Sequence, residues 1–274
     1  MTDSVTLISD RVALKIEGCI AFVSLSRPDK YNGLDLPMFE GLVKAAKKIR
    51  KDRSIRAVIL SGEGKCFSSG LDVAGLRRNP LGIGKLLLKP GRSYTNLAQD
   101  VAWCWRELPI PVIAIIHGKC YGGGLQIALG ADFRIAKPDA ELSVMEIKWG
   151  LIPDMTGSVT LRELVAIDVA KELAMTGRLV SAEEAKALGL VTSVSEDPMP
   201  DAIALAQQIS SRSPDAIAAA KKLFNETWTA DEKTALNLET RLQKKLIGRW
   251  NQIAAASKNL MDNPLDYRKR RFKG

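Results

Sequence analysis

The sequence predicts an α/β protein that continues into a helical C-terminal region, and three observations support this. Short apolar runs at 57–60 and 111–116 have the length of buried strands, whereas 37–51 carries apolar residues at helical spacing. Strands alternate with helices in the first half of the chain, which favours a parallel or mixed sheet with crossover helices. Beyond Pro153 the pattern becomes almost entirely helical.

The elements of the sheet region follow in order. Apolar residues at 12–16 and 20–25 lie on either side of Glu17 and Gly18, which is typical of a β-hairpin. The helix over 37–51 comes next. The remaining elements are a strand at 57–60, a glycine- and proline-bearing loop at 70–91, a helix at 97–108, a strand at 111–116, a turn at 118–124, a helix at 125–129 and a strand at 132–136.

The helical region is expected to contain one short strand, at 191–194. Ser181, with Glu184 three residues later, predicts a capping box at the start of a helix. We divide the chain into a core, residues 1–195, and a helical region, residues 196–274, whose surface is suited to subunit contacts. The helices expected after Pro153 cover 159–164, 168–175, 182–188, 200–211, 214–228 and 231–256.

The charge balance indicates an anionic partner. The chain carries 40 Lys and Arg residues against 31 Asp and Glu residues, a formal net charge of +9. Nucleic acid and a small molecule that bears phosphate both fit such an excess. The basic residues are spread along the chain except for one run, Arg268-Lys269-Arg270-Arg271.

Cysteine and histidine usage argues against disulfides and metal sites. The four cysteines show no CxxC spacing and the chain has one histidine, so we expect a reducing compartment and no bound metal. The N-terminus has acidic residues where a signal peptide needs an apolar run, and the most apolar stretch, 110–116, is far too short to span a bilayer. We therefore expect a cytoplasmic protein without a membrane segment.

Two glycine-bearing turns, 66–72 and 117–125, each follow a buried strand. A glycine turn that opens a helix leaves backbone N–H groups unpaired at the positive end of the helix dipole, which suits a phosphate or a transient oxyanion. Phosphate motifs do not fit, because Ile59 and Cys66 stand where a P-loop needs Gly and Ser or Thr, and Ile127 replaces the third small residue of a dinucleotide fingerprint. Close packing of a helix on a strand is the structural alternative for the glycines.

Five segments, taken in order, give a more specific signal. They are Ser26-Arg27-Pro28 with Asn32, Phe67 to Asp72, Pro111 to Ala114 with Gly122-Gly123-Gly124, Glu146 with Gly150 to Pro153, and Leu173 to Gly177 with Ala182 to Ala185. Through these segments the chain resembles the crotonase family of enoyl-CoA hydratases and isomerases.

The resemblance implies a spiral of repeated β-β-α turns followed by a helical trimerisation region, assembled as a homotrimer or a dimer of trimers. It implies an acyl-CoA thioester as the substrate, with coenzyme A entering as part of that substrate and no separate cofactor. It also implies an oxyanion hole made by the backbone N–H groups of Leu71 and Gly123.

The same resemblance places further residues around the substrate. Lys30 and Lys65, together with the basic C-terminal run, become candidates for contacts with the CoA phosphates, and a solvated surface position explains each lysine equally well. The other expected substrate-binding residues flank the two glycine turns; they are Ser69, Gly70, Asp72, Gly122 and Gln126.

The acid–base residues depart from the family pattern. Hydratases of the family use two carboxylates, and Glu146 matches one of them, but the other position is Gln126, an amide that cannot exchange protons. One base can still move a proton between two carbons of a single substrate, which favours isomerisation of an enoyl-CoA with Glu146 as proton shuttle. Two alternatives stay open: a hydratase in which Gln126 positions the water for Glu146, and a non-catalytic protein that binds acyl-CoA or nucleic acid. The glycine turns make nucleic acid the weaker candidate.

Two further polar residues lie near these segments. Asp154 stands eight residues after Glu146, where it either raises the pKa of that carboxyl by charge proximity, as a second catalytic residue, or caps the helix that starts near Gly157. His117, the single histidine, is expected to stabilise a turn.

Overall fold

The structure, a computed structural model, describes residues 5–77, 80–91 and 93–272. Within these residues the main sheet has seven strands in the order β1-β2-β3-β4-β5-β7-β10. Its first three strands are antiparallel and the others extend it in parallel, so the predicted mixed sheet is confirmed. The strands are β1 (Thr6–Ile8), β2 (Val12–Glu17), β3 (Ile20–Leu25), β4 (Ala57–Gly62), β5 (Val112–Ile116), β7 (Phe133–Ala136) and β10 (Ser193–Val194).

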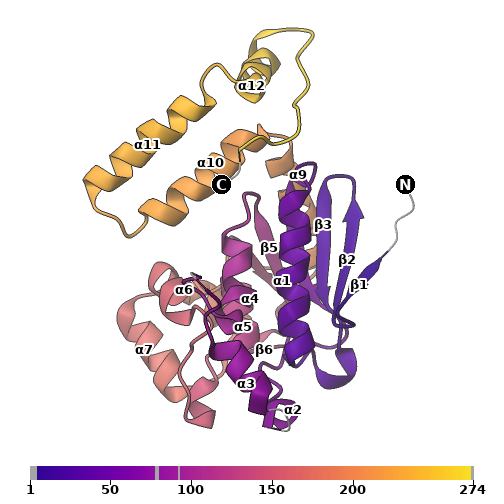
Figure 1. Cartoon of the computed structure of the whole chain (residues 1–274), viewed down its shortest axis with the longest axis vertical. Helices are drawn as coiled ribbons and strands as arrows, with labels where there is room; N and C mark the ends of the chain where they lie inside the picture. The colour runs from indigo at the N-terminus through magenta and orange to yellow at the C-terminus, as the bar shows by residue number, and fades with distance from the viewer. Residues whose placement is uncertain (1–4, 78–79, 92, 273–274) are drawn as a thin grey trace.

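Helices cover both faces of this sheet (Figure 1). On one face lie α1 (Leu36–Lys51) and α4 (Leu97–Arg106), and on the other lies α9 (Pro198–Ser210). In β4, Leu60 packs into the core with α1, whereas Ile59 packs with Ala202 and Ala206 of α9. Because β4 is buried on both faces, its sequence is continuously apolar rather than alternating.

A second sheet forms where a turn was expected at 118–124. It joins β6 (Lys119–Tyr121), β8 (Glu141–Ser143) and β9 (Val180–Ser181) in that order. These strands are short and find partners that are distant in sequence, so no local periodicity predicts them. The helix α5 (Gly123–Leu129) begins directly after β6.

The segment 70–91 was expected to be a loop but contains two short helices, α2 (Val73–Arg77) and α3 (Pro80–Leu87), with residues 78–79 outside the described part. The first of them begins after Asp72, whose Oδ1 accepts the N–H of Gly75 at 2.9 Å. A carboxylate at this position stabilises the first turn of a helix.

The helices after Pro153 largely follow the prediction. They are α6 (Gly157–Leu164), α7 (Ile167–Thr176), α8 (Ala182–Leu188), α9, α10 (Pro214–Thr227), α11 (Glu232–Leu246) and α12 (Trp250–Leu260). The single helix expected over 231–256 is broken, because Gly248 adopts a φ of 72° between α11 and α12. Ser181 accepts the N–H of Glu184 at 3.2 Å and caps α8, but the Glu184 carboxylate pairs with Arg178, so only half of the capping box forms.

The last two helices pack on α10 and project away from the sheet (Figure 1). The chain then returns towards α10, where buried Asp215 accepts the N–H groups of Arg271 and Phe272. Arg270 is only 3% exposed, and the guanidinium of Arg268 lies 3.6 Å from the ring centroid of Trp250. Part of the basic C-terminal run is therefore used to fasten the tail.

No helix in the described part of the chain is long and apolar enough to cross a membrane.

Asn32 joins the exit of the β2–β3 hairpin to the first glycine turn. It is fully buried, with a φ of 52° that asparagine tolerates better than most residues. Its Oδ1 accepts the N–H of Arg27 at 2.9 Å, and its Nδ2 donates to the carbonyls of Glu63 and Cys66 at 2.8 and 2.9 Å. One side chain thus holds three backbone segments together.

We expect Asn32→Ala to lower the free energy of unfolding by about 2–3 kcal/mol, because it leaves buried backbone groups without partners. Urea denaturation monitored by circular dichroism measures this loss. The matched control is Asn237→Ala on the exposed surface of α11, which should change stability by less than about 0.5 kcal/mol. Equal losses in the two variants would contradict this role of Asn32.

Candidate active site

The two glycine turns lie side by side because they follow β4 and β5, which are neighbours in the sheet. Ser68 pairs with Cys120 as a parallel bridge; its N–H donates to the carbonyl of Lys119, and its carbonyl accepts the N–H of Tyr121, both at 3.0 Å. Gly70 has a φ of 88°, and a Cβ there would lie 2.8 Å from the carbonyl oxygen of Tyr121. Only glycine permits this approach.

The N–H groups of Leu71 and Gly123 are unpaired in these turns. Leu34 and Leu71 form an isolated parallel bridge, in which the N–H of Leu34 donates to Gly70 and the carbonyl of Leu34 accepts from Asp72, so the N–H of Leu71 takes no part in it. Gly123 is the first residue of α5, where an N–H has no helical acceptor. Within residues 5–77, 80–91 and 93–272, neither N–H finds an acceptor, and both can donate to a bound group.

Glu146 lies against the second turn. It begins the short 3₁₀ helix η2 (Glu146–Trp149), and β8 just before it is tied to the turn by the N–H of Gly122, which donates to the carbonyl of Ser143. A Cβ on Gly122 would lie 3.3 Å from Oε1 of Glu146. That Oε1 accepts Nε2 of Gln126 at 2.6 Å, whereas the buried Oε2 has no partner in the described part of the chain. A buried, unpaired carboxylate oxygen is a candidate proton acceptor.

Burial raises the pKa of the Glu146 carboxyl above its ordinary value. The hydrogen bond from Gln126 acts in the opposite direction, and the charge of Asp154 adds a smaller rise. Charge proximity to Asp154 was the expected cause, but desolvation is the larger one. A raised pKa brings the base closer to neutral pH, where it can both take and return a proton.

Asp154 is exposed in this chain, although nearby atoms desolvate its carboxyl enough to raise its pKa. It does not cap α6, because the N-cap of that helix is Thr156, which makes no side-chain capping bond. The neighbouring Met155 approaches the oxyanion turn closely: a Cβ on Gly123 would lie 2.7 Å from the Met155 sulfur. Asp154 thus adjoins the candidate site without contacting Glu146 by a hydrogen bond.

Asp72, expected to contact the substrate, is engaged within the protein. Besides capping α2, it forms an ion pair with Arg27 at 2.8 Å, and these contacts lower the pKa of its carboxyl. Its position beside Leu71 therefore serves to fix the first glycine turn. Ser69, also expected at the substrate, donates its N–H to the carbonyl of Tyr31 and is half-buried.

Lys30 and Lys65 lie on adjoining segments at the edge of the first turn. Both are exposed, and Asn32 fastens their segments to each other. Sequence reasoning missed a third lysine here: Nζ of Lys119 lies 5.3 Å from the ring centroid of Tyr31. Three exposed lysines on neighbouring segments form a surface that attracts anions. Lys119 lies in β6, and only the pairing of this strand with the first turn brings it close to the other two lysines.

The basic C-terminal run lies at the opposite end of α1 from this surface. Arg270 is close enough to Arg50 and Arg53, at the end of α1, for their charges to lower its pKa. Sixteen residues of helix span roughly 24 Å. The tail is therefore too far away to contact a phosphate bound at Lys30 and Lys65 of the same chain. Nε2 of His117 lies 3.1 Å from the carbonyl oxygen of Gly64, in keeping with a turn role.

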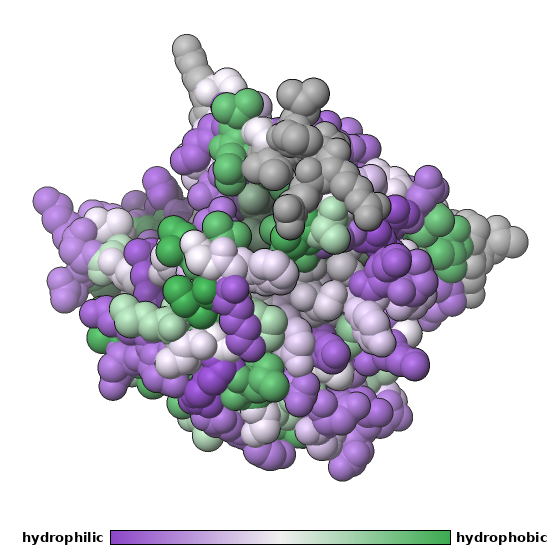
Figure 2. All heavy atoms as spheres, turned by 90° about the horizontal axis from the view of Figure 1, so that it is seen from below, coloured by the Kyte–Doolittle hydropathy of each residue, from purple (hydrophilic) through white to green (hydrophobic). Residues whose placement is uncertain are grey.

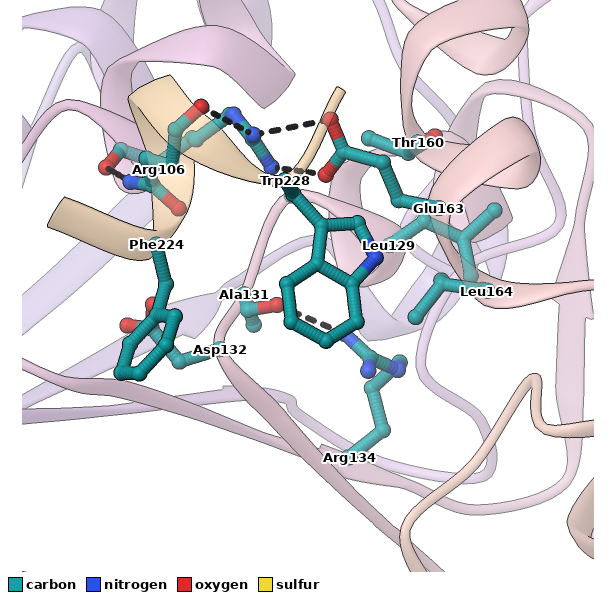
Figure 3. Close-up of a pocket in the computed structure, with 12 residues that line it drawn as sticks. Arg106, Leu129, Ala131, Asp132, Arg134, Thr160, Glu163, Leu164, Phe224 and Trp228 are labelled. Atoms are coloured by element: carbon teal, nitrogen blue, oxygen red, sulfur yellow. Dashed lines mark hydrogen bonds and ion pairs between the residues drawn. The ribbon is translucent and has the colours of Figure 1, made fainter. Parts of the chain in front are cut away.

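A hollow of about 190 Å³ lies elsewhere, between α10 and the core (Figure 3). At its border the guanidinium of Arg106 pairs with the Glu163 carboxylate at 2.7 Å, and Arg134 donates to the carbonyl of Ala131. Phe224 of α10 and Trp228, the residue that follows this helix, line the hollow. None of the residues expected from the sequence line this hollow, and its ion pair joins α4 to α6.

The end of the molecule at which α2 and α3 lie has a mixed surface, with hydrophobic patches between hydrophilic ones (Figure 2). In the segment that begins at Glu146, four large apolar side chains are exposed in the single chain: Ile147, Trp149, Leu151 and Ile152. Several exposed apolar side chains in one short segment are suited to contact with an acyl chain or with another protein chain.

Unpaired backbone amides beside one buried carboxyl, on an α/β scaffold, form the kind of site with which an enzyme polarises a carbonyl group and moves a proton next to it. The sequence matches the enoyl-CoA hydratase/isomerase family model over residues 15–255, and the chain belongs to this family, within the crotonase superfamily.

Proteins named as hydratases and proteins named as isomerases are both similar to this chain. YngF of Bacillus subtilis, named for enoyl-CoA hydratase/isomerase, is 37% identical over 83% of this chain and 86% of its own length. The mitochondrial Δ(3,5)-Δ(2,4)-dienoyl-CoA isomerase of Rattus norvegicus is 34% identical over 78% of this chain and 68% of its own. The crystal structure of an enoyl-CoA hydratase from Bacillus anthracis aligns with a TM-score of 0.85 at 28% identity, covering 95% of this chain and all of that one. The crotonase-like fold with its C-terminal helices is thereby confirmed.

We expect Gly70→Ala to disturb the first turn in two ways, through its positive φ and through a clash with Tyr121. The matched control is Gly18→Ala, which has a φ of 58° and open space around the added Cβ. Gly18→Ala should cost about 1 kcal/mol of stability, and Gly70→Ala about 2–4 kcal/mol. Thermal denaturation measures both, and activity on an enoyl-CoA should fall only in Gly70→Ala. Similar behaviour of the two variants would show that the turns are not closely packed.

Proposed function

We propose that this chain isomerises an enoyl-CoA, with the amides of Leu71 and Gly123 binding the thioester oxygen and Glu146 carrying the proton. The observation that supports this most is the buried, unpartnered Oε2 of Glu146 beside the unpaired N–H of the second turn. The second polar side chain of this site is an amide, Gln126, whose carbonyl oxygen already accepts two backbone N–H groups.

In this mechanism Oε2 of Glu146 removes a proton from C2 of a 3-enoyl thioester. The electrons of that C–H bond form the enolate, whose negative oxygen is stabilised by the two backbone N–H groups. When the thioester carbonyl re-forms, the double bond moves to C2–C3 and C4 takes the proton back from Oε2. No atom is gained or lost, so one base is sufficient.

Hydration of a 2-enoyl-CoA is the second candidate. It needs a water molecule whose proton is accepted while its oxygen attacks C3. Both lone pairs of the Gln126 oxygen are engaged, so this side chain can offer the water only an N–H of Nε2. Glu146 would have to position and deprotonate the water alone, which makes hydration the weaker candidate. A non-catalytic role in binding acyl-CoA or nucleic acid gives no reason for a buried base.

The proposed substrate is an acyl-CoA thioester, with coenzyme A entering as part of it and no separate cofactor. Lys30 and Lys65, with Lys119, provide a positive surface for its phosphates. The cytoplasmic location stays a prediction, which cell fractionation tests.

The chain is further proposed to form a homotrimer or a dimer of trimers. The end of α10 and the helix α11 expose Trp228, Leu236 and Ile247, each at least 60% accessible in the single chain, and these apolar side chains could pack against a second chain. Light scattering should give the mass of three or six chains, and the mass of one chain would contradict the assembly.

The reaction is tested by product analysis on 2-enoyl-, 3-enoyl- and 3,5-dienoyl-CoA esters. We expect conversion of the 3-enoyl ester to the 2-enoyl ester as the fastest reaction, and little 3-hydroxyacyl-CoA. Rapid hydration of the 2-enoyl ester without isomerisation would favour the hydratase, and binding of generic DNA with no affinity for acyl-CoA would favour a nucleic-acid partner.

We expect Glu146→Gln to reduce kcat roughly 10²- to 10⁴-fold without loss of stability. Because burial raises the pKa of Glu146, the folded chain is destabilised as the pH rises through that raised pKa, and the neutral amide removes this penalty. In the wild type, kcat/KM should fall as the pH drops through the same pKa. The matched control is Glu239→Gln on exposed α11, which should change neither property. Retention of near wild-type turnover by Glu146→Gln would contradict the mechanism.

A further inference from the structure

Gln126 occupies a fixed orientation on α5. It is 1% exposed, and its Oε1 lies 2.8 Å from the N–H nitrogen of Met155 and 3.0 Å from that of Gly157. Both of these groups are donors, so only the carbonyl end of the Gln126 amide can face them. The amino end must therefore face Glu146.

This orientation distinguishes the two oxygens of Glu146. Nε2 of Gln126 donates to Oε1 at 2.6 Å, so Oε1 acts as an acceptor and carries no proton there. Oε2 is buried and has no partner among the described residues. The carboxyl thus has one oxygen held by the protein and one oxygen left for a substrate.

The same amide fixes the turn at the start of α6. A Cβ on Gly157 would lie 2.8 Å from Oε1 of Gln126, and the Met155 sulfur lies close to Gly123 of the oxyanion turn. Asp154 directly precedes Met155 in this turn. The Gln126 side chain therefore holds both the Glu146 carboxyl and the turn that carries Asp154.

We propose that Gln126 is a positioning residue, whose amide holds Glu146 so that Oε2 alone exchanges protons with the substrate. This inference rests on the proposed role of Glu146 as the base. The role differs from the predicted contact of Gln126 with the substrate or with a water, and it is favoured by three hydrogen bonds that engage the Gln126 amide with Glu146, Met155 and Gly157.

A carboxylate at position 126 would act differently despite its similar shape. Glutamate can keep both bonds from Met155 and Gly157 through one oxygen. Its other oxygen, however, would face Oε1 of Glu146 at the distance where Gln126 now donates, and two carboxylates so close share a proton. The amide therefore keeps Glu146 independent of its neighbour, and Gln126→Glu is the variant that separates positioning from packing.

The test compares wild type, Gln126→Glu and Gln126→Met in the full-length chain, with kcat/KM on a 3-enoyl-CoA measured from pH 5 to 10. In Gln126→Glu we expect kcat/KM at pH 7 to fall about 10-fold or more, with the acidic midpoint of the profile raised by at least about one pH unit and activity regained at alkaline pH. In Gln126→Met we expect a fall in both kcat and thermal stability, because Met155 and Gly157 lose their acceptor. Gln208→Glu, at an exposed position of α9, makes the same charge change and should leave the profile unaltered.

A purely structural role would give a different result, because Gln126→Glu retains both backbone bonds and would then keep the wild-type pH profile. That outcome overturns the proposal. The positioning role can also be tested without turnover, by ¹³C NMR titration of the glutamate carboxyls. The Glu146 signal is assigned as the one that disappears in Glu146→Gln. If the wild type turns over no enoyl-CoA but Gln126→Glu raises the Glu146 midpoint, the proposed function fails and the positioning role stands. If the wild type is active and this midpoint does not move, the positioning role fails.

Discussion

The close approach of the two glycine turns is the constraint on which the rest of the site depends. Hydrogen bonds of Ser68 to both sides of Cys120 hold the turns together, and the absence of a side chain at Gly70 lets them touch. The second turn also opens α5, so its position determines where Gly123 presents its N–H and where Gln126 projects. The site is thus built on neighbouring strands of one sheet, which gives it a rigid base.

Glu146 shows how the protein balances stability against function. An isolated carboxyl in a buried position destabilises the folded chain, and one unpaired oxygen adds to that cost. The hydrogen bond from Gln126 to Oε1 of Glu146 offsets part of this cost in stability. It also fixes the orientation of the carboxyl, and therefore the position of the unpaired Oε2. A second ionisable group at position 126 would have changed the protonation of Glu146 instead, so the amide and the single base belong together physically.

Much of the fold could be predicted from the sequence because its main strands and long helices have their own periodicity, as in 57–60 and 37–51. The three strands of the small sheet could not, because each has two or three residues and is defined only by distant partners. Leu71, Gly123 and Glu146 were found through segments that resemble a known family. The engagement of Asp72 with Arg27, and the third lysine at the anionic surface, depend on contacts between segments that no local pattern records.

The most direct measurement is a crystal structure of the chain with an unreactive ketone analogue of an acyl-CoA, in which a methylene group replaces the thioester sulfur and the carbonyl group is retained. The account predicts that the carbonyl oxygen lies about 3 Å from the nitrogens of both Leu71 and Gly123, with Oε2 of Glu146 facing the adjacent carbon. A carbonyl bound elsewhere, or either amide directed away from it and bonded to the protein, would contradict the account.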